Sequence, residues 1–163
     1  MTAIVIDTET TGIPKNKFKD WSECYSVQIS YIIIDKKYNV MNSKKFFIKD
    51  PLHPSLQSSF KIHHIDEETR NSQGIDILDF LNTFKNDIIE NSVKMIISHG
   101  IYFDIGLLLM EMKRNQFDPS FMRKIMFLDT KNSKLYSKID NLSGSVKKHN
   151  LSVNYEGNPH DSL

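Results

Sequence analysis

The stretch "IVIDTETTG", residues Ile4–Gly12, decides how this sequence is interpreted. Its first residues are apolar and β-branched without polar alternation, which predicts a buried strand at residues 3–6. The apolar run stops at two carboxylates, Asp7 and Glu9. Because side chains two positions apart on a strand point the same way, both carboxylates face one place if the strand continues through Glu9.

Two neighbouring carboxylates without a basic partner repel each other and lose solvation energy when they are buried together. A divalent cation removes this conflict, and carboxylate oxygens select hard ions such as Mg²⁺ or Mn²⁺. Asp7 and Glu9 are therefore candidate metal ligands. The alternative is a strand end whose carboxylates are solvated or cap a turn.

A third candidate ligand is Asp104, in the segment "SHGIYFDIGLLLMEM". A strand predicted at residues 93–98 ends in this segment, a loop with Gly100 follows, and Asp104 lies near the start of an apolar helix predicted at residues 102–115. The helix dipole alone also favours an acidic residue there. In open α/β sheets, however, ligands bind at the carboxyl ends of the strands, where both Asp7 and Asp104 are expected.

The segment "GNPHDSL" contains a candidate general base, His160. Gly and Pro set a turn before it, and the histidine then stands at the start of an expected helix. An imidazole near an acidic metal cluster suits proton abstraction from water, since its ordinary pKa lies near neutrality. The alternative is a surface histidine.

The remaining pattern predicts a single α/β domain over residues 1–163. Three successive strands joined by short turns should form an antiparallel meander, and the later strands should return through helices as parallel crossovers. Besides the segments above, we expect strands at residues 27–35, 38–48 and 124–128, helices at 75–89 and 142–149, a short helix beginning at Pro119, and a Pro/Ser loop at 49–59.

Composition narrows the class of protein. The chain has 163 residues, of which 39% are hydrophobic and 25% charged, with a net charge of +1, so a polyanion partner requires a local binding site. Its one cysteine, Cys24, excludes an internal disulfide and is interpreted as structural. The start lacks the pattern of a signal peptide, and the longest apolar runs are far too short to cross a membrane. We expect an intracellular, cytoplasmic protein without a membrane partner.

Together these segments resemble the motifs of the DEDD superfamily of 3′→5′ exonucleases, histidine subtype, which includes the proofreading subunit of bacterial DNA polymerase III. "IVIDTETTG" resembles the first motif. "SHGIYFDIGLLL" resembles the second, with Gly100 and Ile101 in place of the usual Asn and Ala. "NPHDSL" resembles the start of the third. "VQIS", "FKIHHID" and "FLDTKNS" are softer matches in the right order.

The resemblance implies a ribonuclease H-like fold: a five-stranded mixed sheet, its first three strands antiparallel, with helices on both faces. It implies that Asp7, Glu9 and Asp104 hold two Mg²⁺ or Mn²⁺ ions and that His160 is the base. The substrate would be the 3′ end of a nucleic acid, preferably single-stranded, and the products nucleoside 5′-monophosphates. The implied context is proofreading or repair, with a DNA polymerase as a partner.

The resemblance also implies substrate-side residues. Thr10, Thr11 and Gly12 are expected to place N–H groups and hydroxyls near the terminal nucleotide. Ile13 is expected either to form an apolar face for the terminal base or to pack in a core or loop. His63 matches a substrate-side histidine, although a surface role is equally credible. Phe103 is grouped with these residues, although core packing is favoured for it.

One departure concerns the third motif. The family carries a second carboxylate five residues after the histidine, two positions beyond Leu163. We therefore expect a longer parent sequence and a truncated C-terminal helix. Two alternatives to a deoxyribonuclease stay open: an exoribonuclease that trims RNA 3′ ends, and a catalytically inactive exonuclease-like binding domain.

Overall fold

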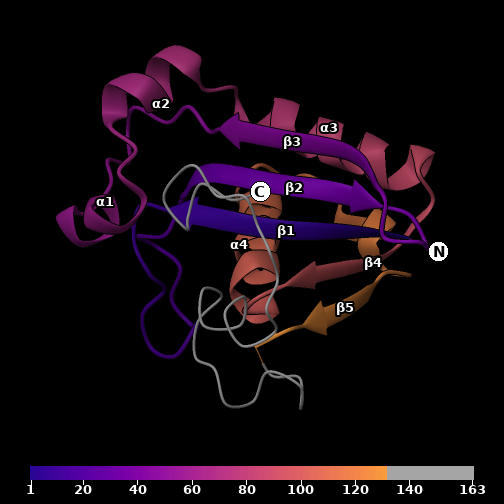
Figure 1. Ribbon diagram of the computed structural model, residues 1–163. Helices are drawn as coiled ribbons and strands as arrows, with labels where there is room; N and C mark the ends of the chain where they lie inside the picture. The colour runs from indigo at the N-terminus through magenta and orange to yellow at the C-terminus, as the bar shows by residue number, and fades with distance from the viewer. Residues whose placement is uncertain (132–163) are drawn as a thin grey trace.

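The computed structural model describes residues 1–131, which form one mixed sheet with helices packed against it (Figure 1). The strand order is β3-β2-β1-β4-β5. β1 pairs antiparallel with β2, and β2 with β3, whereas β1/β4 and β4/β5 are parallel. The predicted α/β class, with a meander followed by parallel crossovers, is confirmed. The strands are β1 (Thr2–Thr10), β2 (Ser26–Ile34), β3 (Val40–Phe47), β4 (Val93–Ser98) and β5 (Met126–Asp129).

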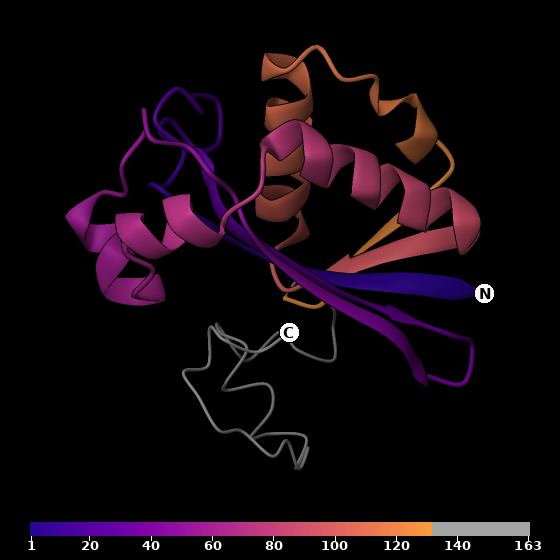
Figure 2. The same ribbon diagram turned by 90° about the horizontal axis from the view of Figure 1, so that it is seen from above.

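Two helices, α3 (Ile77–Glu90) and α4 (Ile101–Arg114), cover one face of this sheet (Figure 2). α3 presents an apolar stripe at helical spacing, and its side chains are buried against alternate residues of β1 and β2. The buried set comprises Ile4, Ile6, Ile29, Tyr31, Ile33, Phe80, Leu81, Phe84 and Ile88. The alternation along β1 therefore directs Ile4, Ile6 and Thr8 toward the helices, and Asp7 and Glu9 toward the opposite face.

One polar network crosses this core. The Tyr31 hydroxyl donates a hydrogen bond of 2.5 Å to Asp87 Oδ2, and the Lys44 ammonium lies 2.7 Å from the same oxygen. Burial raises the pKa of Tyr31, and the hydrogen bond to Asp87 adds to that shift. The neutral phenol and the Lys44 cation together satisfy an otherwise buried carboxylate.

Two helices were not predicted: α1 (Gln57–His63) and α2 (Glu67–Gln73), which lie beyond the ends of strands β1 and β3 (Figure 1). The loop predicted at residues 49–59 is wrong at its end, because α1 begins at Gln57. Each of these helices buries only one or two residues, so neither shows the apolar stripe from which the other helices were predicted. The short helix expected at Pro119 is present as the 3₁₀ segment Pro119–Met122.

Two further predictions about strands need correction. β1 was predicted to end at residue 6 but continues to Thr10, because pairing with β2 holds Asp7–Thr10 extended despite their polarity. The link between β1 and β2 is not a short turn but the loop of residues 11–25. The helix expected at residues 142–149, His160 and the expected C-terminal helix lie outside the described residues.

Cys24 is structural, as expected. It is fully buried, and its thiol donates to the Gly12 carbonyl at 3.1 Å. Burial raises its pKa to about 11, so it remains a protonated, unreactive thiol near neutral pH. None of the helices in residues 1–131 has the length and apolar character that a membrane span requires.

Arg70 joins α2 to the sheet. Its side chain has no exposed surface, and its guanidinium donates to the carbonyls of Ile48 at 2.8 Å, His53 at 2.8 Å and Ser26 at 2.9 Å. Burial lowers its pKa, and the carboxylates of Asp50 and Glu67 oppose that shift. The planar guanidinium thus supplies hydrogen bonds to backbone carbonyls near the start of β2 and the end of β3.

Replacing Arg70 by Lys should lower the free energy of unfolding by about 3 kcal/mol or more, because an ammonium cannot serve three divergent carbonyls and each lost bond to a charged group costs about 1.5–3 kcal/mol. Urea denaturation followed by circular dichroism measures this change. The matched control is Arg123→Lys at an exposed position, which should leave the midpoint unchanged. Equal effects in both variants would contradict the role given to Arg70.

Candidate active site

The carboxylates of β1 lie at its C-terminal end. Strand geometry extends through Glu9, so the condition for Asp7 and Glu9 to share a face is met. Asp7 lies opposite Ser30 and is half-buried, while Glu9 lies opposite Gln28 and is buried. Both neighbours on β2 are themselves buried polar residues. This end of the sheet therefore holds a concentration of oxygen atoms within an otherwise apolar strand pair.

Asp104 lies in the first turn of α4 and is only 4% exposed. The Thr8 hydroxyl donates to Asp104 Oδ1 at 2.6 Å, and the Ser98 hydroxyl donates to Oδ2. Burial raises the pKa of Asp104 to about 7, nearby Asp7 adds to the rise, and the two hydroxyl donors oppose it. One carboxylate thus joins the ends of β1 and β4 to the start of α4.

Asp7 and Asp104 face the same cavity, which has a volume of about 430 Å³. It lies where the carboxyl ends of parallel strands meet, the edge at which α/β sheets bind ligands. Its lining residues are Asp7, Thr8, Phe18, His99, Gly100, Tyr102, Phe103, Asp104, Asp129 and Lys131. Glu9 does not line it. Among residues 1–131, no group of three or more His, Cys, Asp or Glu side chains is arranged to hold a metal ion.

Gly100 makes the entry into α4 possible. Its φ of 118° lies in the left-handed region that favours glycine, and its N–H donates to Asp129 Oδ1 at 3.0 Å. Asp129 Oδ1 also accepts from the N–H of Lys131 at 2.9 Å, so this carboxylate bonds to the chain just after β5. The carboxylate therefore orients the loop that leads to Asp104.

His99 was part of a matched motif but received no role from the sequence. Its Nδ1 lies 3.0 Å from Thr130 Oγ1, and its Nε2 finds no hydrogen-bond partner among the described residues. Burial, followed by the charge of Lys131, lowers its pKa, so the ring is neutral at neutral pH. Its position at the end of β4 was the signal that could have identified it as a cavity residue.

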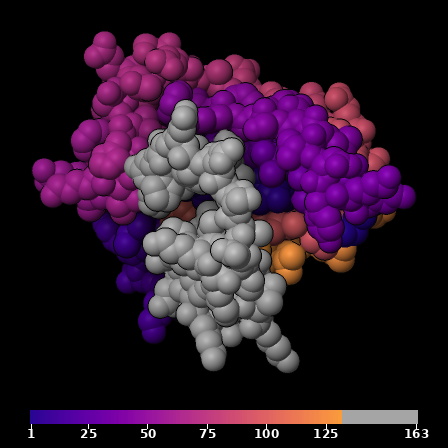
Figure 3. Space-filling model, in the orientation of Figure 1, coloured from indigo at the N-terminus to yellow at the C-terminus, as the bar shows by residue number. Residues whose placement is uncertain are grey.

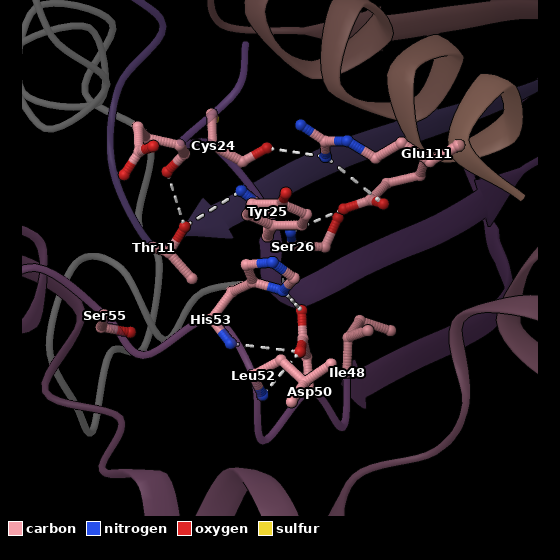
Figure 4. Close-up of polar contacts among 12 residues, drawn as sticks. Thr11, Cys24, Tyr25, Ser26, Ile48, Asp50, Leu52, His53, Ser55 and Glu111 are labelled. Atoms are coloured by element: carbon pink, nitrogen blue, oxygen red, sulfur yellow. Dashed lines mark hydrogen bonds and ion pairs between the residues drawn. The ribbon is translucent and has the colours of Figure 1, made fainter.

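The residues after Glu9 form the base of the β1–β2 loop (Figure 4). Thr11 Oγ1 donates to the Glu23 carbonyl and accepts from the Tyr25 N–H, each at 3.0 Å, and Thr10 Oγ1 donates to the Gly12 carbonyl at 2.7 Å. A Cβ on Gly12 would lie 3.2 Å from the Glu23 carbonyl oxygen, so glycine permits this close approach. These contacts hold the loop; substrate binding by the same residues stays a prediction.

The other predicted substrate-side residues lie in different environments. Ile13 is 75% exposed, so packing in a core is wrong, and its contact with a terminal base stays a prediction. His63 is buried and its Nδ1 accepts from the Ile65 N–H at 3.0 Å, so a surface role is also wrong. Phe103 both packs beside Trp21, at 5.9 Å between ring centroids, and lines the cavity.

The pKa of Asp104 predicts how stability depends on pH. Between its ordinary value of 3.8 and the folded value of about 7, the folded chain binds the proton more tightly than the unfolded chain. In the metal-free protein, the free energy of unfolding should therefore fall as pH rises through this window, by up to about 4 kcal/mol. Asp104→Asn should flatten this pH dependence, which urea titrations in chelator at pH 4.5 and 8 will measure. An unchanged slope would contradict the assignment.

Comparison with known proteins identifies solved structures with a similar fold. No protein-family model and no curated protein matches the sequence. Among solved structures, E. coli Exonuclease I in complex with a dT13 oligonucleotide matches with a TM-score of 0.64 and 18% identity, over 78% of this chain and 27% of that one. Exonuclease I from Methylocaldum szegediense matches with a TM-score of 0.63 and 19% identity, over 80% and 28%.

A product-bound exonuclease I gives a TM-score of 0.66 at 18% identity, over 78% of this chain and 29% of that one. The chain thus spans just over a quarter of the length of these neighbours. The five-stranded mixed sheet and its helices match theirs, which confirms the predicted ribonuclease H-like architecture. Within residues 1–131, α3 and α4 cover one face of the sheet, so the expectation of helices on both faces stays a prediction. The chain has the fold that these exonuclease I structures contain over the matched region.

Proposed function

We propose that this chain is a 3′→5′ exonuclease that hydrolyses phosphodiester bonds at the 3′ end of single-stranded DNA and releases nucleoside 5′-monophosphates. One observation carries the proposal: Asp7 and Asp104, from β1 and α4, face one cavity at the carboxyl ends of the parallel strands. The fold shared with Exonuclease I supports it, and one of those neighbours was solved with a dT13 oligonucleotide.

The donor chemistry of the cavity fits a hard divalent cation. Asp104 is a buried carboxylate whose proton affinity is raised by burial and by Asp7, and a cation between two such groups relieves that repulsion. We propose that Asp7 and Asp104 hold two Mg²⁺ or Mn²⁺ ions together with Glu9, which lies two residues after Asp7 on β1 and outside the cavity lining. When bound, such ions lower the pKa of an attacking water and stabilise the charge on the leaving 3′ oxygen.

The chain's own residues then have separate tasks. Thr8 and Ser98 fix both oxygens of Asp104, so that its carboxylate keeps one orientation. His160 takes the proton from the attacking water in this proposal. Thr10, Thr11, Gly12, the exposed Ile13 and the ring of Phe103 adjoin the terminal nucleotide. A frayed end is preferred because a paired base must first be unstacked.

Proofreading or repair is the proposed context, with a DNA polymerase as the proposed partner. An exoribonuclease remains a second possibility for the same cavity, because contacts to phosphate do not distinguish DNA from RNA. Parallel assays on matched DNA and RNA single strands decide between them. Binding without hydrolysis of either strand would instead favour an inactive binding domain.

Asp7→Asn and Asp104→Asn should each reduce Mn²⁺-dependent degradation of a 3′ single strand by a factor of about 10³ or more, because either change removes an anionic ligand of the cations that would stabilise the transition state. Gel analysis of a 5′-labelled oligonucleotide measures the loss. The matched control is Asp79→Asn, at an exposed position of α3, which should leave the rate unchanged. Full activity in either cavity variant would overturn the proposed site.

His160→Ala should slow hydrolysis by about 10²- to 10⁴-fold while leaving Mn²⁺ affinity largely intact, because a general base acts on water and not on the ion. Single-turnover kinetics and calorimetric titration with Mn²⁺ separate the two effects. A parallel loss of Mn²⁺ affinity would assign this histidine to the metal site instead.

A further inference from the structure

The tip of the β1–β2 loop carries a group of residues that the proposed chemistry does not use. The sequence "KNKFK", residues 15–19, places three lysines around one aromatic residue, and all five residues are exposed. We call these residues the lysine loop. It projects from the end of the sheet in Figure 1 and forms the indigo protrusion at the lower left of Figure 3. The whole chain has a net charge of only +1, so this is a local concentration of positive charge.

Phe18 connects the lysine loop to the candidate active site. Its side chain lines the same cavity as Asp7 and Asp104, yet the residue is 52% exposed. Its ring meets Phe103 edge-on, with centroids 6.2 Å apart and an interplanar angle of 81°. It also lies 6.1 Å from the Trp21 ring. An aromatic side chain is thus held at the mouth of the cavity with half of its surface available.

The backbone holds this ring in place. Lys15 and Asp20 exchange backbone hydrogen bonds of 2.8 and 3.2 Å at the base of the lysine loop, and Trp21 Nε1 donates to the Phe18 carbonyl at 2.9 Å. Asn16, Lys17 and Phe18 all have positive φ, between 52° and 67°. Successive left-handed non-glycine residues are costly and persist only where surrounding contacts impose them. The contacts around the lysine loop therefore impose its backbone conformation.

The charges match a nucleic-acid strand. Lys15, Lys17 and Lys19 lie within five consecutive residues, and the acidic residue that follows them, Asp20, accepts a hydrogen bond from the Ser22 N–H at 3.0 Å. Single-strand binding sites combine cationic side chains along the backbone with aromatic rings on which bases stack. Both components are present within a single turn of chain, and they adjoin the cavity.

We propose that the lysine loop binds the single strand next to its 3′-terminal nucleotide: Phe18 stacks on a base, and Lys15, Lys17 and Lys19 contact the adjoining phosphates. This inference rests on the proposed function for the position of the 3′ end. Stacking on a ring needs an unpaired base but no particular one, so the lysine loop selects single strands without selecting sequence. It also brings positive charge to a cavity whose own carboxylates repel phosphate.

The first test measures binding at several salt concentrations, in chelator so that the strand stays intact. Fluorescence anisotropy with a labelled oligothymidylate of about 16 nucleotides, the upper end of single-strand site sizes, reports affinity. The variant Lys15→Gln/Lys17→Gln/Lys19→Gln should reduce the slope of log affinity against log salt by about 2, at about 0.7 for each lost phosphate contact. The control, Lys36→Gln/Lys37→Gln in the β2–β3 turn, should keep the slope of the unmodified chain.

The second test concerns the ring. Phe18→Leu keeps apolar packing beside Trp21 but removes the stacking surface, and should weaken binding roughly 5- to 150-fold with little change in salt slope. Phe18→Tyr should bind as the unmodified chain does. Thermal unfolding by circular dichroism checks that both variants are folded. The same anisotropy measurement with a labelled oligouridylate shows whether the lysine loop distinguishes RNA from DNA.

The outcomes separate this inference from the proposed function. If the unmodified chain degrades and binds the strand while the lysine and Phe18 variants bind equally well, the lysine loop is not the strand site and the exonuclease stands. If these variants lose binding but the unmodified chain hydrolyses no strand, the lysine loop is confirmed as a single-strand site, while its placement beside a 3′-terminal nucleotide fails with the exonuclease. Loss of binding in the Lys36/Lys37 control to the same extent would overturn a specific role for the lysine loop.

Discussion

The buried carboxylate of Asp104 is the constraint on which the candidate site depends. A carboxylate out of contact with water needs donors, and the hydroxyls of Thr8 and Ser98 supply one to each oxygen. Those hydroxyls come from two parallel neighbouring strands, so the bonds fix the ends of β1 and β4 relative to the start of α4. Burial nevertheless still raises the pKa of Asp104 to about 7. The neutral hydroxyls therefore provide hydrogen bonds to both oxygens of Asp104 but do not neutralise its negative charge. A cation would neutralise that charge.

The alternation of β1 explains how one strand serves both a core and a site. Ile4 and Ile6 point toward α3 and α4, and Thr8 continues the same row, so the last inward position becomes polar where the apolar core ends. Asp7 occupies the other row and still reaches the cavity that Asp104 lines, because this cavity lies at the end of the sheet. Because side chains alternate between the two faces of a strand, one row of β1 packs in the core while the other row carries Asp7, and the strand itself is continuous.

The sequence predicted the sheet well because its strands carry buried β-branched runs, and the order of strands and helices restricts the topology. It failed where polar residues adopt regular structure. Residues 7–10 are extended because β2 pairs with them, not because of their own propensity. Helix α2 buries only Arg70, and its available signal was Asp66 capping the Thr69 N–H with two acidic residues in the first turn.

Prediction of the site also succeeded for some residues and failed for others. Motifs identified Asp7 and Asp104, and the fold does bring them to one cavity. Local sequence could not reveal that Phe18, in the loop between β1 and β2, lines the same cavity. That placement depends on distant contacts: the guanidinium of Arg114, in α4, donates to the carbonyls of Cys24 and Trp21 and lies 4.0 Å from the Tyr25 ring. Such contacts join residues about 90 positions apart, so no window of sequence contains them.

The loop of residues 11–25 combines an immobilised base with an exposed tip, and this contrast bears on where a substrate can bind. At the base, the hydroxyl of Thr11 is occupied by main-chain partners, and Gly12 is in close contact with its neighbours. These contacts hold the residues proposed to adjoin the terminal nucleotide in one conformation. At the tip, Phe18 exposes apolar surface beside three exposed lysines, and Ile13 is exposed next to the base. In the proposed strand site, the base of the loop therefore holds the exposed ring of Phe18 at the edge of the carboxylate cavity.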